Sequence, residues 1–274
     1  MRLDMDQLLR QALSPEKEPD NRLNQKIIQK SKETGTMIKK NRKGMIAALV
    51  AVGVLMIGSL SAFATWKYLT PDQAAEQIFH DEALSKAFQG EDAIVVNEIQ
   101  EMGDYRVTFL GIVSGKNLSD YTDWDEAGQI QEDKTYAIVA IENRDGTPRS
   151  DVSDEHYGED AFFISPIISG LNPWEYSIMT MGGSYSEDVV DGIQYRLVEC
   201  DNVEMFADRG LYLCVQSGTF YDNQAYSMDE ATGAFTRNES YEGLNILFDL
   251  PIDESEADPE AAQSYMEQMG TAWQ

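Results

Sequence analysis

An uncharged run of twenty residues, Met45–Ala64, constrains this chain more than any other feature. Its only polar side chains are Ser59 and Ser61. At about 1.5 Å rise per residue, a helix of this length spans about 30 Å, the thickness of a bilayer's hydrocarbon core. Because every backbone N–H and C=O in lipid must pair within the segment, a single spanning segment has to be an α-helix. The sequence therefore predicts one transmembrane helix at residues 44–66.

The flanking charges predict how this helix is oriented. The basic residues Lys39, Lys40, Arg42 and Lys43 precede it, whereas Lys67 is the one basic residue close to its other end. Cytoplasmic flanks of membrane helices carry the excess of Lys and Arg. We therefore expect a single-pass protein of the cell membrane, with its N-terminus in the cytoplasm and its C-terminal part outside the cell.

A cleaved export signal is the alternative interpretation of the same run. The run ends in Ala62-Phe63-Ala64, which matches the small-x-small pattern of a cleavage site. The apolar segment is long for a signal, however, and 44 residues precede it instead of a handful. Those residues also carry patterned apolar side chains that a disposable signal does not need. We therefore favour an anchor that stays uncleaved.

The net charge of −27 averages two segments of opposite character. Residues 1–43 hold 11 basic and 6 acidic side chains, whereas the remainder holds 10 basic and 42 acidic ones. A surface with such an excess of carboxylates repels phosphate, so we expect no nucleic-acid binding by the exported part.

The cytoplasmic arm, residues 1–43, carries two short apolar stripes at helical spacing. The stripes are separated by Pro15 and Pro19, which interrupt a helix. Their main apolar members are Leu8, Leu9, Leu13, Leu23, Ile27 and Ile28. So short an arm cannot bury these side chains against itself, so we expect it to order on a partner. A protein partner is favoured, and the anionic inner leaflet of the membrane is the alternative.

After the span, residues 67–90 are expected to form one juxtamembrane helix. Thr70 suits the N-cap, Pro71 the first helical position and Gly90 the position past the end. The buried stripe of this helix would consist of Ala74, Ala75, Ile78, Leu84 and Phe88.

Residues 91–250 change to short β-branched runs separated by turn-rich pieces, which is typical of antiparallel strands. We expect a mainly β (α+β) exported domain built like a sandwich, with about eight strands. The predicted strands lie within residues 93–99, 105–114, 135–142, 161–169, 174–183, 193–200, 211–221 and 244–250. The acidic tail, residues 251–274, either forms one short helix over residues 259–269 or stays loose.

The chain contains two cysteines, Cys200 and Cys214, both on the expected outer side. An oxidising exterior allows a disulfide between them, and a hairpin could bring them into range. Two free buried thiols are an equally acceptable interpretation.

No catalytic motif stands out in the sequence, so we expect neither an enzyme nor a cofactor. The two histidines, His80 and His156, lie far apart, and neither is paired with a recognisable nucleophile. The acidic stretch 151–160 lacks the alternating spacing of a calcium loop, so we interpret it as a solvated loop that holds no metal. Trp174 and Tyr176 could line a ligand groove, although core packing suits each of them better.

Several phrases of the chain resemble a family of single-pass membrane proteins of Gram-positive bacteria. These proteins carry an exported β-rich domain of uncharacterised function and are described as anti-sigma-factor-like. The phrases are NQKIIQKSKE before the span, YLTPDQAAEQI and FLGIVSGKNLSD after it, and then ISPIISGLNPWEYSIMTMGG, VEMFADRGLYLCV and NESYEGLNILFDLP.

The resemblance implies a regulator of transcription that holds an extracytoplasmic-function sigma factor on its cytoplasmic arm and senses an envelope signal outside. Residues 1–43 contain neither Cys nor His, so binding of the sigma factor would be metal-free and would use the two stripes named above. The alternative is a membrane-tethered binding module for an unknown extracellular ligand, with no sigma-factor role.

Overall fold

The computed structural model describes residues 68–121 and 133–272 of the chain. Within these residues no helix is both long and apolar enough to cross a bilayer. The predicted span 44–66, its basic flank and the two stripes of the cytoplasmic arm all lie outside the described residues. They remain predictions.

The described part is mainly β, with antiparallel sheets and few helices, as the sequence predicts. The larger sheet has the strand order β1-β2-β3-β6-β5, the second has the order β10-β7-β4, and β8 pairs with β9 in a small hairpin. The strands are β1 (Ile94–Met102), β2 (Tyr105–Lys116), β3 (Asp133–Asn143), β4 (Phe162–Ile168), β5 (Ser184–Val190), β6 (Ile193–Asp201), β7 (Leu211–Ser217), β8 (Tyr226–Met228), β9 (Phe235–Arg237) and β10 (Asn245–Asp249).

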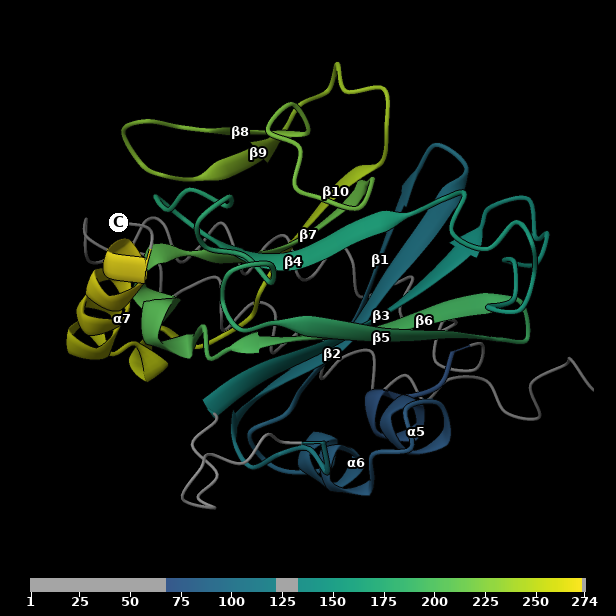
Figure 1. Ribbon diagram of the computed structural model, residues 1–274, viewed down its shortest axis with the longest axis horizontal. Helices are drawn as coiled ribbons and strands as arrows, with labels where there is room; N and C mark the ends of the chain where they lie inside the picture. Colours follow the sequence, from purple (N-terminus) through teal and green to yellow (C-terminus); the bar gives the residue numbers. More distant parts are fainter. Residues whose placement is uncertain (1–67, 122–132, 273–274) are drawn as a thin grey trace, which may run out of the picture. The chain divides into compact units, whose positions relative to one another are not determined.

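The main core lies between the five-stranded and the three-stranded sheet (Figure 1). Alternate residues of β3 point to opposite faces, so Val139 faces this core while Ile138 faces the other side of the sheet. The three-stranded sheet contributes Ile164, Leu213 and Phe248, all almost fully buried. Two facing sheets that share one apolar core make this part of the chain a sandwich.

A second core covers the opposite face of the five-stranded sheet. There α5 (Pro71–Gln77) and α6 (Glu82–Phe88) pack below the sheet in the view of Figure 1. Gly111 of β2 permits this approach, because a Cβ at that position would lie 2.8 Å from Cγ of Pro71. The predicted apolar stripe is confirmed, since all of its members are buried: Ala74, Ala75, Ile78, Leu84 and Phe88.

The prediction of a single helix over residues 67–90 is wrong, because the chain forms two. Thr70 is the N-cap of α5 and Pro71 its first residue, as expected. The break comes at His80, whose φ is 55°, a value that an α-helix cannot contain. Asp81 then starts α6 by accepting a hydrogen bond from the amide of Leu84 at 2.8 Å. An aspartate three residues before that amide was a recognisable N-cap signal.

Residues 174–183 do not form the predicted strand. Bonds of the helical type, such as Tyr176 N–H to Asn172 O and Met181 N–H to Ser177 O, fold this segment into successive turns. The hydroxyl of Thr180 reinforces them by donating to the carbonyl of Glu175 at 2.8 Å. Side-chain bonds of this kind compete with strand pairing.

The strand that the sequence did not predict here is β5, which follows directly. It is mostly polar and lies at the edge of the five-stranded sheet, so it lacks the β-branched pattern of the central strands. Its turn into β6 places Asp191 at φ 53° and Gly192 at φ 77°. An Asp-Gly pair with two positive φ values is a strong hairpin signal, and it was present in the sequence.

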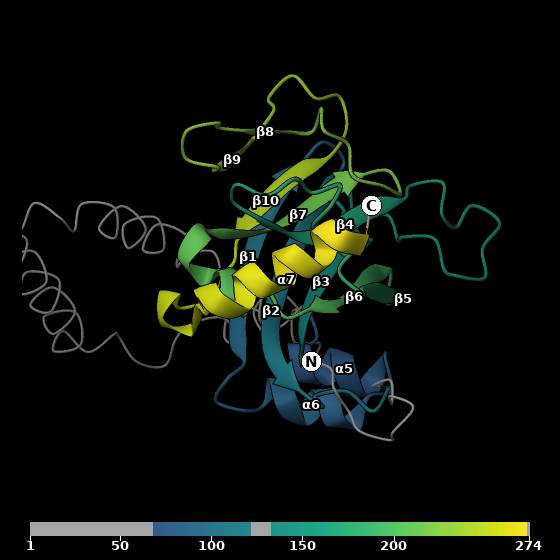
Figure 2. The same cartoon turned by 60° about the vertical axis from the view of Figure 1, so that its left-hand side comes forward.

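The acidic tail forms a helix, α7 (Pro259–Ala272), which lies at one end of the two sheets (Figure 2). It packs on the 3₁₀ helix η1 (Glu204–Arg209), where the rings of Tyr265 and Phe206 meet edge to face at 6.1 Å. The phenol of Tyr265 donates to Asp201 at 2.8 Å. A second 3₁₀ turn, η2 (Glu254–Glu256), precedes α7. Of the two alternatives for the tail, the helix is therefore correct.

Both cysteines are free thiols buried in the main core, so the disulfide is not formed. Cys200 lies on β6 and Cys214 on β7, in different sheets, and not on two strands of one hairpin. Burial raises the pKa of Cys214 to about 12 and that of Cys200 well above its ordinary value. Both side chains act as small apolar residues in the core.

The chain joins the five-stranded sheet at the first described residue, Tyr68. Its phenol donates to Glu142 of β3 at 2.7 Å, and Arg106 of β2 donates to the same carboxylate at 2.8 Å. Burial, followed by Glu142, raises the pKa of Tyr68 to about 12. The next residue, Leu69, is held as well, since its amide donates to the phenol oxygen of Tyr195 at 3.2 Å. The segment that leads into α5 is thus fixed to the sheet by buried hydrogen bonds.

We predict that Tyr68→Phe lowers the free energy of unfolding by about 1–2 kcal/mol, because it removes a buried hydrogen bond to a charged acceptor. Thermal unfolding of the purified chain, followed by circular dichroism, measures the change. The matched control is Tyr121→Phe, which removes the hydroxyl of an exposed tyrosine and should leave the melting temperature unchanged. Equal melting temperatures for both variants would contradict a stabilising role of the Tyr68 phenol.

Three half-buried carboxyl groups predict a pH dependence of stability. Burial raises the pKa of Glu98, Glu204 and Asp249, and the charge of Asp249 raises that of Glu98 further. A carboxyl with a raised pKa in the folded state stabilises the fold below its unfolded pKa, and this stability is lost as the pH rises through the folded pKa. The melting temperature should therefore rise as the pH falls from about 7 to about 5.

The variant Glu98→Gln isolates one part of this effect, because it removes a single titrating group from β1. It should melt higher than the parent at about pH 7 and show a smaller rise on acidification. Identical pH profiles for the parent and the variant would contradict the assignment to Glu98.

Candidate functional site

The candidate site is a cleft of about 220 Å³ on the β4–β5 side of the sandwich. On the opposite side the two sheets are joined, because Gln100 of β1 donates to the carbonyl of Leu247 in β10 at 2.9 Å. On the β4–β5 side a sheet of three strands faces one of five, and the cleft lies between them. Two segments form the remaining walls. One is the loop between β3 and β4, which contributes Tyr157, and the other is the series of turns before β5, which contributes Met179.

A buried ion pair between Arg196 of β6 and Glu187 of β5 forms the floor of the cleft. These side chains are 5% and 12% exposed. The two residues are directly opposite each other in the register of the β5–β6 pair. Both Nε and Nη2 of Arg196 donate to Oε2 of Glu187, and its Nη1 donates to the carbonyl of Phe162 in β4. Arg196 thus connects the two sheets.

Glu187 keeps its negative charge despite its burial. Burial acts to raise its pKa, but the charge of Arg196 and the bonds from Tyr157, Arg196 and Gln194 outweigh burial and lower the pKa. The phenol of Tyr157 donates to Oε1 of Glu187, and its own pKa is raised by burial and then by that bond. The loop between β3 and β4 is therefore fastened to the floor through Tyr157.

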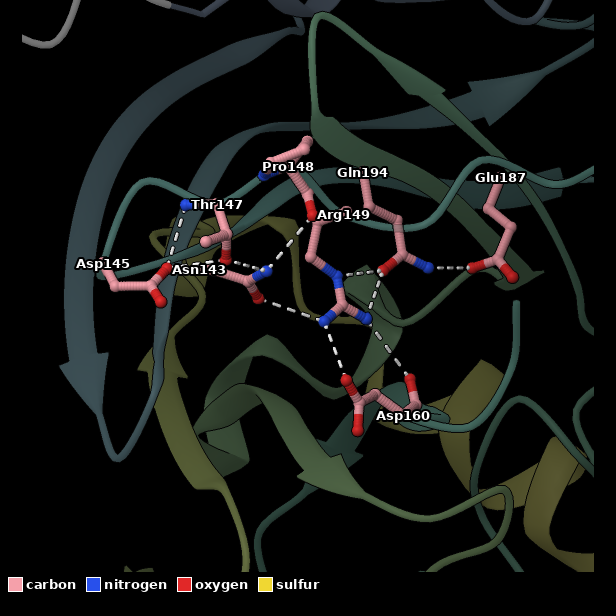
Figure 3. A network of polar contacts seen from close by, with 8 residues as sticks. All are labelled: Asn143, Asp145, Thr147, Pro148, Arg149, Asp160, Glu187 and Gln194. Atoms are coloured by element: carbon pink, nitrogen blue, oxygen red, sulfur yellow. Dashed lines mark hydrogen bonds and ion pairs between the residues drawn. The ribbon is translucent and has the colours of Figure 1, made fainter. Parts of the chain in front are cut away.

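A second arginine, Arg149, lies in the wall of the cleft that the β3–β4 loop forms (Figure 3). Its Nη1 donates to Asn143 at 3.2 Å and to Asp160 at 3.0 Å, and its Nε donates to Oε1 of Gln194 at 3.4 Å. The guanidinium also lies 5.3 Å from the ring centroids of both Tyr105 and Phe162. Two aromatic rings and three polar groups hold this side chain in one place.

Gln194 joins the two ion pairs into one network. Its side-chain oxygen accepts from Arg149, while its Nε2 donates to Glu187 at 2.8 Å. The network thus runs from Asp160 through Arg149, Gln194 and Glu187 to Arg196. Each arginine has a carboxylate within hydrogen-bonding distance, so the charges of the wall compensate each other in pairs.

The cleft offers hydrogen bonding and apolar contact. Phe163, Ile164 and Ile178 supply apolar surface, and the ring of Tyr185 lies against the guanidinium of Arg196 at 4.4 Å. His156 at the rim bonds through Nδ1 to Glu159 at 2.9 Å, and this partner raises its pKa. Such a mixed lining, with a few fixed polar groups, is typical of binding sites for small molecules.

The residues selected from the sequence have different positions relative to this cleft. Cys200 and Cys214 lie in the core. Of the acidic loop 151–160, most carboxylates are exposed, and Asp160 is the one that joins the network. No cluster of metal-ligating side chains occurs in the part of the chain that the structure describes. Trp174 is 55% exposed, whereas Tyr176 is buried in the core, 9% exposed.

Four residues of this network were not recognised in the sequence: Arg149, Glu187, Gln194 and Arg196. A signal for two of them was present in IQYRLVEC, residues 193–200. Alternate residues of a strand lie on the same face, so Gln194 and Arg196 lie on the same face as Val198, which faces the core. The sequence therefore places two polar side chains on the inner face of a buried strand. A buried polar pair needs partners, and this need points to a network.

A second cavity, of about 400 Å³, lies between the β1–β2 hairpin and the segment before β10. Its charged lining consists of Asp104, Glu239 and Glu242, which are all exposed. Its buried polar side chain, Asn245, donates to the carbonyls of Ala225 and Asn238, so it already has its partners. Because the charged side chains of this cavity are all exposed, we consider the β4–β5 cleft the better candidate.

Comparison of the chain with models of protein families, with curated proteins and with solved structures gave no match in any of the three cases.

The ion pair on the floor generates a prediction about stability. Arg196→Met or Glu187→Leu alone leaves one charge buried without its partner, which costs roughly 3 kcal/mol or more. The double variant removes both charges, so its loss should be smaller than the sum of the single losses by about 2 kcal/mol. Urea unfolding of the four proteins measures this coupling.

The control pair is Lys86 and Glu82 on α6, which lie 3.0 Å apart with side chains 70% and 74% exposed. Substitution of this pair should give a much smaller coupling than that of Arg196 and Glu187, because water screens both charges. Additive losses at Arg196 and Glu187 would contradict the importance of their pairing.

Proposed function

We propose that this protein is a single-pass membrane regulator, an anti-sigma factor, that binds a sigma factor through its cytoplasmic arm and senses an envelope ligand through its exported β domain. The arm is residues 1–43, the span is residues 44–66, and the sensor is the sandwich with its β4–β5 cleft. The protein would act without a cofactor and without catalysis.

The cleft supports the sensing part of this proposal. Its polar groups are positioned in advance by mutual hydrogen bonds, so a ligand would meet a wall that needs little ordering. Arg196 and Tyr157 join β6, β4 and the β3–β4 loop at this point. A ligand that alters these bonds would therefore act on both sheets at once.

The attachment at Tyr68 is the observation that carries the proposal. Tyr68 lies two residues after the end of the predicted span, and it is already buried and bonded to Glu142. Only Lys67 separates the predicted span from Tyr68 in the sequence, so the chain offers no long linker between the span and the sheet. So short a separation in the sequence suits a transmembrane signal better than a passive tether.

The cytoplasmic arm supports the choice of a protein partner. Its two apolar stripes lie on a segment too short to bury them, and helices of this type bind in the grooves of partner proteins. The resemblance described above implies that this partner is a sigma factor. Since residues 1–43 contain neither Cys nor His, the interaction would not need a metal.

The experiment is a pull-down of cellular proteins with residues 1–43, in which we expect to recover a sigma factor. Leu9→Asp and Ile27→Asp should abolish capture, because each places a charge on a face that is buried on binding, at a cost of a few kcal/mol. Gln7→Asp and Gln29→Asp are the matched controls. They add the same charge on the opposite face of each helix and should leave capture intact.

Recovery of no sigma factor would overturn the sigma-factor role, and equal capture by all four variants would show that the proposed binding face is wrong. The alternative would then be a membrane-tethered binding module whose arm only sets its orientation. Deletion of residues 1–36 separates the two functions in cells, since an anti-sigma factor loses its cellular effect and a tethered binding module keeps it.

A further inference from the structure

We propose that the β4–β5 cleft binds a neutral, hydroxyl-rich ligand, namely an oligosaccharide. This inference rests on the proposed function in one respect, that the exported domain is a ligand sensor, and it names the chemical class of that ligand. It follows from the charges, the free hydroxyl groups and the strand edge at the cleft.

The charges of the wall disfavour an ionic ligand. Arg149 has all of its nitrogen atoms bonded, to Asn143, Asp160 and Gln194. Arg196 and Glu187 bond to each other. A charged ligand would therefore have to displace an existing ion pair, and the exported part as a whole repels anions. A ligand without net charge neither has to displace an ion pair nor is repelled by the acidic surface.

Free hydroxyl groups favour a ligand with many hydroxyls of its own. Ser150, Tyr185 and Thr219 line the cleft, and their hydroxyls bond to no other residue among those that the structure describes. The carboxylate of Asp160 is 54% exposed and still accessible from the cleft. A hydroxyl can donate and accept, so these groups can pair with sugar hydroxyls in several orientations.

Apolar surfaces stand beside these polar groups. Tyr185 and Met179 are each 56% exposed, although both are large and apolar in their main part. Arg196 lies over one face of the Tyr185 ring, so the exposed surface includes the other face. The C–H face of a sugar ring packs on such a surface by dispersion while its hydroxyls reach the polar groups around it.

The edge of β4 argues against an extended peptide, the other neutral polymer. Ala161 O accepts from Gly218 on the β7 side, so by alternation Phe162, Ile164 and Pro166 turn their backbone groups towards the free edge. The carbonyl of Phe162 is occupied by Arg196, and Pro166 has no N–H. The row of backbone groups at this edge is therefore interrupted at Phe162 and at Pro166, whereas the addition of a strand needs an unbroken row.

The volume is consistent with a single sugar ring inside the cleft. At about 220 Å³ it is smaller than the roughly 300–1,000 Å³ of pockets for drug-sized ligands. Further rings of an oligosaccharide would extend across the rim. Trp174 lies on that side, since its ring meets Tyr221 at 6.1 Å and Tyr221 meets Phe163 of the cleft wall at 6.1 Å.

The test is titration calorimetry of the full-length chain in a detergent without a sugar headgroup. The probes are chitotetraose, cellotetraose and maltotetraose, with tetralysine and tetraglutamate as charged peptides and tetraalanine as a neutral one. We expect at least one of the sugars to bind with a Kd below about 5 mM. Tyr185→Ala should weaken this binding about tenfold or more, and Thr219→Val should weaken it several-fold.

Tyr121→Ala is the matched control, because Tyr121 is an exposed tyrosine that does not line the cleft. It should bind the sugar as the parent does. Binding of none of the three sugars would overturn the proposal, and so would sugar binding that survives Tyr185→Ala and Thr219→Val. Tighter binding of any of the peptides in a manner sensitive to Tyr185→Ala would overturn it as well.

The result of the sugar titration does not depend on whether the proposed sigma-factor role is correct. Capture of a sigma factor by residues 1–43 does not involve the cleft, so it can succeed where sugar binding fails. In that case the protein remains a regulator whose ligand belongs to another chemical class.

Discussion

The central strands of the five-stranded sheet are buried on both faces, and this constraint determines the rest of the architecture. β2, β3 and β6 are buried along nearly their whole length. A sheet of this kind is stable only if both of its faces are covered. The small sheet covers one face and α5 with α6 covers the other, so the helices next to the predicted span are part of the fold itself.

The cleft follows from the unequal width of the two sheets. Three strands cannot cover five, so the outermost part of the large sheet needs a different partner. β5 is polar and carries Glu187 at this place. The uncovered space is filled by two arginines, two carboxylates and an amide from β5, β6 and the β3–β4 loop. The same bonds that satisfy buried polar groups also join the sheets, so the wall of the cleft and the stability of the sandwich depend on the same residues.

The central strands and the apolar stripe of the two helices could be predicted from the sequence because burial leaves a periodic pattern. Ala74 and Phe88 were identified in this way, as were the strands of residues 105–114 and 135–142. The edge strand β5 could not be found by the same criterion, since its polar residues match a loop. Residues 174–183 gave the opposite error, since a strand was predicted where the chain forms turns. Apolar side chains that are buried by turns have a sequence pattern similar to that of a strand.

The cleft was harder to predict than the fold for a physical reason. Arg149 and Asp160 are separated by 11 residues and Glu187 lies 9 residues before Arg196, yet only tertiary packing brings all four together. Each residue alone resembles an ordinary surface charge. The register that turns Arg196 inwards can be read from its strand, but its partners on β5 and on the β3–β4 loop cannot.

The two buried thiols have a practical consequence. Cys200 and Cys214 lie in the core between the sheets, and burial keeps them protonated at neutral pH. An alkylating reagent can therefore reach them only when the sandwich opens. The rate at which these thiols react in the folded protein would report how often the two sheets separate, with no label added to the chain.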